Sequence, residues 1–158
     1  MAFALRFVLA LMCVVAVSAC AKSNVNPEVL AAGKAFLSQN AHAPGVHVTP
    51  SGLQYRILTA GPASGQSPRA SDEVKVNYEG TLLNGTVFDS SYQRGEPAVF
   101  GVTGLIAGWT EALQIMRPGD VWELYVPASL AYGEEGAGQI PPGSTLKFKI
   151  ELVAVSPG

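Results

Sequence analysis

The chain has 158 residues, enough for one domain with a short appendage. Its formal net charge is −2, from 10 basic and 12 acidic side chains, and it has no basic block that would suit a nucleic-acid partner. Both histidines, His42 and His47, lie away from the motifs described below, and no residues have metal-ligand spacing. The sequence therefore predicts no histidine-based site, no metal and no cofactor.

The first 19 residues are predicted to be a signal peptide. Arg6 is followed by an uncharged run over residues 7–17 and then by small residues up to Cys20. This order is typical of secretory signals, and the run is shorter than the roughly 20 residues that a transmembrane helix needs. Val17-Ser18-Ala19-Cys20 is similar to a bacterial lipobox, in which the cysteine becomes the lipidated first residue. An ordinary cleaved signal or a short membrane anchor is the alternative.

Lipidation at Cys20 would anchor the protein to a membrane, since each buried methylene of an acyl chain contributes about 0.8 kcal/mol. Cys13 would be lost with the signal peptide, so the mature protein would have no disulfide. Ala21 after the cysteine resembles the pattern that sorts lipoproteins to the outer membrane. The predicted location is the bacterial cell envelope, at the outer membrane and facing the periplasm.

Residues 20–49 are predicted to form a tether and a short helix. Pro27 suits the first turn of a helix, and the apolar pattern carries this helix to about Asn40. Isolated helices below about 12–15 residues rarely persist in water, so this one is expected to be marginal on its own. A linker helix in a monomer is favoured over a dimerisation element.

Residues 50–158 form a second region, which the pattern predicts to be built mainly from strands. Apolar and polar residues alternate in three stretches, which indicates strands with one buried face: Leu53–Ile57, Val74–Tyr78 and Leu146–Leu152. Val121–Val126 is a further predicted strand. Residues 61–71 are rich in Gly, Pro and Ser and indicate a loop.

One hairpin and one helix complete the predicted fold. Asn84-Gly85 between two apolar pairs predicts a hairpin with a type I′ turn, in which both residues have φ > 0. Trp109, Leu113 and Met116 repeat at i, i+4 and i+7, which predicts a short helix that Pro118-Gly119 ends. The predicted class is α+β, an antiparallel sheet with one short helix against its apolar face.

Five short motifs follow one another in the second region: VNYEG from Val76, FDSS from Phe88, GW at Gly108, AYG from Ala131 and IPPGSTLKF from Ile140. The segment has no nucleophile–base pair. Aromatic residues around one Asp suit a reaction in which no covalent bond is made, such as rotation about a peptide bond.

In these motifs the chain resembles the FKBP-type peptidyl-prolyl cis-trans isomerases, from about Pro50 to Val155. The resemblance implies a curved antiparallel sheet wrapped around one short α-helix, here preceded by the short N-terminal helix. GKAFLSQN and PSGLQYRIL are similar to the macrophage-infectivity-potentiator branch, most of whose N-terminal arm is missing. The family's partners would be proline-containing polypeptides, with macrolides as inhibitors.

The resemblance also implies which residues form the active site. The catalytic positions are a carboxylate that faces the twisting carbonyl, a hydroxyl donor, an aromatic wall and an indole floor: Asp89, Tyr132, Phe88 and Trp109. The substrate-binding positions are two further aromatic walls, an arginine that orients the carboxylate, an apolar pair and a flap residue: Tyr78, Phe148, Arg94, Leu105, Ile106 and Ile140.

Each aromatic residue taken alone would more often belong to a core than to a site, and Asp89 could simply cap a turn. Trp122 matches no pocket position and is interpreted as packing. Two features depart from the family pattern: Ala98 stands where many compact members have an aromatic residue, and the loop Glu134–Gln139 is short and acidic. A more open and more acidic rim is expected.

The predicted function is peptidyl-prolyl cis-trans isomerisation in exported proteins. The alternative is a non-catalytic module that binds proline-containing segments and acts as a holdase chaperone in the periplasm. A purely structural envelope lipoprotein is a third possibility, which leaves the pocket residues without explanation.

Overall fold

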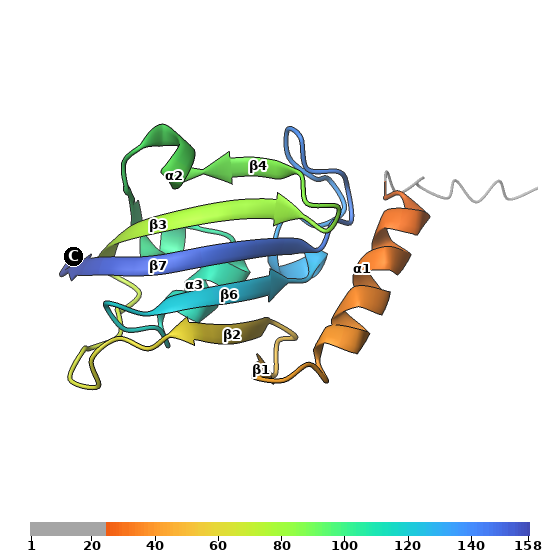
Figure 1. Ribbon diagram of the computed structural model, residues 1–158. Helices are drawn as coiled ribbons and strands as arrows, with labels where there is room; N and C mark the ends of the chain where they lie inside the picture. The colour runs from red at the N-terminus through yellow and green to blue at the C-terminus, as the bar shows by residue number, and fades with distance from the viewer. Residues whose placement is uncertain (1–24) are drawn as a thin grey trace, which may run out of the picture.

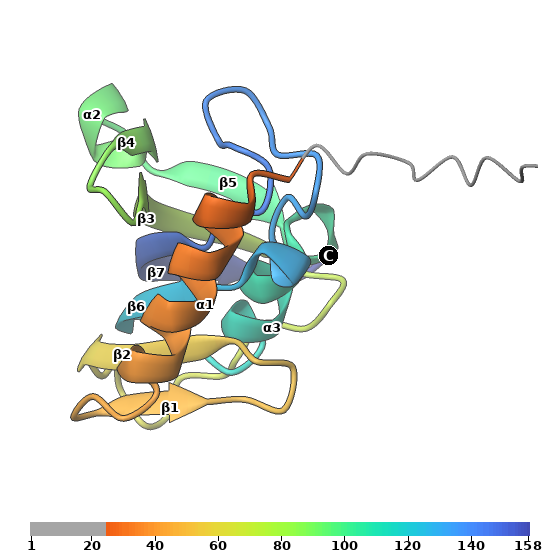
Figure 2. The same ribbon diagram turned by 90° about the vertical axis from the view of Figure 1, so that its right-hand side faces the viewer.

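A computed structural model describes residues 25–158; the predicted signal peptide and Cys20 lie outside the described residues. Within this range, seven strands form one antiparallel sheet in the order β1-β2-β6-β7-β3-β4 (Figure 1), with β5 also paired to β3 (Figure 2). The strands are β1 (Val46–Val48), β2 (Gln54–Thr59), β3 (Glu73–Leu82), β4 (Val87–Ser90), β5 (Ala98–Gly101), β6 (Val121–Val126) and β7 (Leu146–Ser156). None of the helices in residues 25–158 has the length and apolarity to cross a membrane.

The longest strand pair, β3 with β7, lies at the centre of the sheet. The other edge of β3 pairs with two strands, β5 and β4. β3 pairs with β7 from Glu73 to Leu82. On its other side it pairs with β5 as far as Val76 and with β4 only from Glu79 onward. The sheet is therefore interrupted beside residues 77–78 of β3.

The helix α3 (Ala107–Leu113) lies against the apolar face of the sheet, as the sequence predicted. Trp109 and Leu113 are buried on it. Met116, which was predicted to lie on the same helix, is buried beyond its end, so the helix ends earlier than the predicted stop at Pro118-Gly119. Inward-facing side chains of β3, β6 and β7, such as Val76, Leu124 and Ile150, are fully buried in the same core. The predicted α+β class, with a curved antiparallel sheet around a short helix, is confirmed.

The hairpin between β3 and β4 is present, but the predicted type I′ turn is wrong. Gly85 has a φ of +88°, whereas no residue other than glycine in the described range has a positive φ, so Asn84 does not. The Leu82 N–H donates to the Thr86 carbonyl, and the Gly85 N–H donates to the Leu82 carbonyl. These bonds close a three-residue loop, a type I turn followed by one left-handed residue. The Asn84 side chain accepts from the Thr86 N–H and stabilises the turn.

The N-terminal helix α1 (Pro27–Asn40) has the predicted bounds and lies across one end of the sheet (Figure 2). Gly33 is its buried residue, and a Cβ there would overlap the Thr145 hydroxyl. The Phe36 ring lies 5.7 Å from that of Tyr125, and the Gln54 side chain donates to the Leu37 carbonyl. These contacts hold α1 on the sheet, which a helix that is marginal in isolation requires.

Candidate active site

A cavity of about 430 Å³ opens between α3 and the inner face of the sheet. Residues from β3, β4, β5, β7 and α3, together with the loops before α3 and after β6, line it: Tyr78, Phe88, Asp89, Phe100, Gly104, Leu105, Ile106, Trp109, Tyr132 and Phe148. Eight of the ten residues that the sequence resemblance implied are in this lining. Arg94 and Ile140 are not.

The Trp109 ring stands nearly perpendicular to three other aromatic rings. Tyr78 lies 5.1 Å from it at 87°, Phe148 lies 5.3 Å away at 85°, and Phe100 lies 6.1 Å away at 82°. Such edge-to-face pairs are each worth about 0.5–1.5 kcal/mol beyond the area they bury. They hold the four rings in fixed orientations, so the cavity has a preformed aromatic wall.

Gly80 explains how two of these rings meet. It follows Tyr78 by two residues on β3 and lies beneath Phe88 and Phe148, whose rings are 5.6 Å apart at 89°. A Cβ at Gly80 would come within 2.6 Å of the Phe88 ring and 2.8 Å of the Phe148 ring. The glycine of the VNYEG motif is therefore a packing requirement of the pocket wall.

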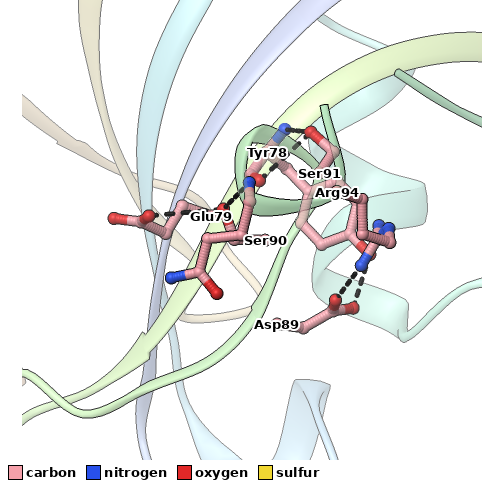
Figure 3. A network of polar contacts seen from close by, with 7 residues as sticks. Tyr78, Glu79, Asp89, Ser90, Ser91 and Arg94 are labelled. Carbon is pink, nitrogen blue, oxygen red and sulfur yellow. Dashed lines mark hydrogen bonds and ion pairs between the residues drawn. The ribbon is translucent and has the colours of Figure 1, made fainter. Parts of the chain in front are cut away.

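The carboxylate of Asp89 is held at the edge of the cavity by two side chains (Figure 3). The Tyr78 hydroxyl donates to Asp89 Oδ2 at 2.5 Å, and Arg94 Nη1 forms a short ion pair with Oδ1. Arg94 Nη2 also donates to the Tyr78 hydroxyl oxygen at 3.0 Å. Arg94 therefore lies behind the carboxylate and orients it without lining the cavity.

These contacts keep Asp89 ionised. Burial alone would raise the pKa of Asp89, but the hydrogen bonds from Tyr78 and Arg94 outweigh it and hold this pKa below its ordinary value. Burial and the neighbouring carboxylate raise the pKa of the Tyr78 hydroxyl, so it remains a donor. Both charged side chains of the pair are more than 40% exposed, so the ion pair adds little stability and mainly sets geometry.

Asp89 does not cap the turn that follows it. The helix α2 (Ser91–Arg94) begins directly after β4, and the Ser90 hydroxyl caps it by accepting from the Gln93 N–H. Gly95, with a φ of +79°, ends the helix in the left-handed conformation. The single turn of α2 therefore places the Arg94 side chain beside Asp89.

The loop residues lie where the cavity opens. Leu105 and Ile106 follow a 3₁₀ turn (Val102–Gly104) and lead into α3, with Ile106 at its N-cap position. Tyr132 follows a second 3₁₀ turn (Ala128–Leu130) and is 40% exposed. Its side chain lines the cavity and is partly exposed to solvent.

Ile140, the implied flap residue, is not among the residues that line the cavity. It is 7% exposed and belongs to the hydrophobic core, and its backbone pairs with Ala137 to close the preceding loop. Glu134 and Glu135 in that loop are exposed, but residues 134–139 contribute nothing to the lining. Trp122 stacks on Tyr55 at 4.3 Å and 9° and is a packing residue, as interpreted from the sequence.

Sequence reasoning missed two lining residues, Gly104 and Phe100, of which only Phe100 has a side chain. Phe100 lies on β5 two residues after Ala98, and residues two apart share a face of a strand. Ala98 is half-buried and does not line the cavity, whereas Phe100 contacts both Tyr78 and Trp109. The alternation of Ala98 and Phe100 was a signal that could have identified this residue.

A family of known function matches this chain. The model of the FKBP-type peptidyl-prolyl cis-trans isomerases matches residues 64–153. The chain belongs to the FKBP-type peptidyl-prolyl cis-trans isomerase family. A second model, the domain amino terminal to FKBP-type peptidyl-prolyl isomerase, matches residues 14–57 and so includes α1.

Individual relatives agree with this assignment. The peptidyl-prolyl cis-trans isomerase Mip of Coxiella burnetii is 57% identical, over 77% of this chain and 53% of that protein. The outer membrane protein MIP of Legionella longbeachae is 55% identical, over 79% and 53%. The crystal structure of FkpA from Escherichia coli superposes with a TM-score of 0.79 at 45% identity, covering 82% of this chain and 60% of that one. The chain therefore spans about half the length of these two curated relatives.

Proposed function

We propose that the protein is a peptidyl-prolyl cis-trans isomerase that accelerates X-Pro bond rotation in exported polypeptides. The observation that carries the proposal is the Asp89 carboxylate, held ionised by Tyr78 and Arg94 at the edge of an aromatic cavity. Family membership supports the same activity. The chain offers a substrate an apolar cavity with one oriented charge, a combination that suits rotation rather than bond cleavage.

The physical basis is preferential binding of the twisted bond. Rotation about an X-Pro bond faces a barrier of about 18–20 kcal/mol, which arises from amide resonance. The planar amide is the more dipolar form and is favoured by hydrogen bonds to water, whereas the twisted transition state is less dipolar. An apolar cavity that excludes water therefore lowers the barrier without covalent chemistry.

Each group in the cavity has a role in this mechanism. Trp109 would support the proline ring, with Phe88, Tyr78 and Phe148 around it, while Leu105 and Ile106 would contact the preceding residue. Asp89 would face the carbonyl carbon as it twists, oriented by Arg94, and Tyr132 would donate to a substrate carbonyl. Ile140 is buried in the core, so we assign it to support of the loop before it.

We further propose the arrangement in the cell. Residues 1–19 would be a lipoprotein signal peptide, 20–49 the tether and helix, and 50–158 the isomerase domain. Lipidation at Cys20 would hold a monomer on the periplasmic side of the outer membrane. A relative named outer membrane protein MIP supports an envelope location. Mass spectrometry of Cys20 after membrane fractionation tests the anchor, and an unmodified cysteine would reject it.

The test of activity is isomerisation of a Leu-Pro peptide by the purified full-length chain, with and without rapamycin. We expect acceleration that rapamycin abolishes, because the macrolide would fill the cavity. Asp89→Val and Trp109→Ala variants that remain folded should lose this acceleration. A folded wild-type chain that does not accelerate the reaction, but prevents aggregation of a proline-rich client, would favour the holdase alternative.

A further inference from the structure

The short helix α2 contributes one more residue to the network around Asp89. Ser91 is its first residue and is fully buried. The Ser91 hydroxyl accepts a hydrogen bond from the backbone N–H of Tyr78 at 2.8 Å and donates one to the carbonyl oxygen of Tyr78 at 3.3 Å. Figure 3 shows Ser91 against the Tyr78 backbone, with Asp89 nearby. A single side chain therefore satisfies both backbone groups of Tyr78.

This contact lies where the sheet is interrupted. β5 pairs with β3 only as far as Val76, and β4 pairs with it only from Glu79 onward. The N–H and C=O of Tyr78 face the gap between these two strands and bond to Ser91 in place of a neighbouring strand. Buried backbone groups need partners, so the hydroxyl replaces the strand that is missing at this position.

The same helix holds the other end of Tyr78. Arg94 follows Ser91 by three residues, a spacing that places two side chains on one face of a helix. Its guanidinium donates to the Tyr78 hydroxyl oxygen, and that hydroxyl donates to Asp89. Tyr78 is thus fixed at its backbone by Ser91 and at its tip by Arg94.

We propose that Ser91 is a positioning residue for the isomerase reaction: it fixes Tyr78 across the gap in the sheet, so that the Tyr78 hydroxyl directs the Asp89 carboxylate into the cavity. The inference rests on the proposed function, because Asp89 is the group that Ser91 positions. Ser91 does not line the cavity and acts through Tyr78. Loss of its hydroxyl therefore lowers kcat more than it raises KM, because Tyr78 is only one of the aromatic walls and Phe88, Trp109 and Phe148 keep their places in the lining.

Ser90 provides a matched control in the same turn. It is also buried, and its hydroxyl makes two hydrogen bonds of 3.3 Å, from the Gln93 N–H and to Glu79, but none to Tyr78. We expect Ser91→Ala to lower kcat about 10-fold with KM within about threefold. Ser90→Ala, which removes the cap of α2 and the hydrogen bond to Glu79 but leaves the backbone of Tyr78 bonded to Ser91, keeps both within about twofold. An equal loss of kcat in the two variants would mean that Ser91 merely stabilises α2, and would overturn the inference.

A second comparison asks whether Ser91 acts through the carboxylate. In an Asp89→Asn background, adding Ser91→Ala lowers the residual kcat by less than about twofold, because the group that it positions is already lost. A further drop equal to that seen in the wild-type background would contradict the inference, since it would show that the two residues act independently.

Amide hydrogen exchange of Tyr78, measured by NMR, gives a readout that does not depend on catalysis. The Tyr78 amide is protected in the wild type and in Ser90→Ala, and it exchanges faster in Ser91→Ala. Ser91→Cys, which is slightly larger than serine and donates only weakly, serves if Ser91→Ala does not fold. Unchanged protection in these Ser91 variants rejects the positioning role, whereas a folded wild type without isomerase activity rejects the proposed function.

Discussion

Replacement of Gly80 by alanine tests whether the aromatic wall is packed as tightly as the structure indicates. The new Cβ would lie 2.6 Å from Phe88 and 2.8 Å from Phe148, about 1 Å closer than the 3.5–4.0 Å of an ordinary carbon contact. The two rings are in edge-to-face contact with each other, and Phe148 also contacts Trp109. Neither ring can move without disturbing the wall, so we expect a loss of about 1–3 kcal/mol in the free energy of unfolding.

Gly101 offers the matched control for this variant. It lies on β5, its φ is not positive, and a Cβ there would meet nothing within 4 Å. Gly101→Ala should therefore leave stability unchanged or raise it by about 0.4–1 kcal/mol. Urea unfolding gives the two free energies, and isomerisation of a Leu-Pro peptide gives kcat/KM, which should fall only in Gly80→Ala. A Gly80→Ala protein with the stability and activity of the wild type would refute the packing argument.

Three further predictions concern other parts of the molecule. The pKa of Asp89 lies below its ordinary value of 3.8, so the stability from its contacts is fully present above pH 3.8 and is lost as the pH falls through the folded-state pKa. Isomerase activity should therefore not change with the protonation of Asp89 between pH 7 and about 4. A fall in activity that begins above pH 5 and depends on Asp89 would contradict the assignment. Gly33→Val should detach α1 from Thr145 and lower the free energy of unfolding by about 1–3 kcal/mol, with kcat/KM unchanged; unfolding identical to that of the wild type would show that α1 does not dock. Trp122→Ala should lower the free energy of unfolding in urea by about 3–5 kcal/mol, because it removes the stack on Tyr55. The molecules that remain folded should keep the kcat/KM of the wild type. A lower kcat/KM per folded molecule would place Trp122 in the site.

The sequence predicted the architecture because its periodicities are strong. Alternation along β3 and β7 and the helical spacing of Trp109 and Leu113 each indicate one element, and the structure has each of them. Eight of the ten implied site residues line one cavity, because their order along the chain matched that of a known family. Turn geometry was harder to predict, since Asn84-Gly85 occurs both in type I′ turns and in the three-residue loop observed.

The features that the sequence did not reveal depend on contacts between distant segments. Docking of α1 depends on Gly33 meeting Thr145, and a single glycine in a helical pattern does not indicate close approach. The inward position of Ile140 depends on how its loop closes on Ala137. The role of Ser91 depends on the absence of a strand beside Tyr78, which requires knowledge of where β4 and β5 end.

The interruption in the sheet also explains why the site lies where it does. A continuous strand beside β3 would bond to the backbone of Tyr78 and leave no room there for α2. Because β4 ends at Ser90 and β5 begins at Ala98, the chain between them folds over the gap and brings Ser91 and Arg94 to the two ends of Tyr78. The pairing of β3 with β7 holds the opposite edge of the same strand. The carboxylate of Asp89 is therefore aimed by a short segment, buried at Ser91 and exposed at Arg94, that is attached to the most extensively paired strand of the fold.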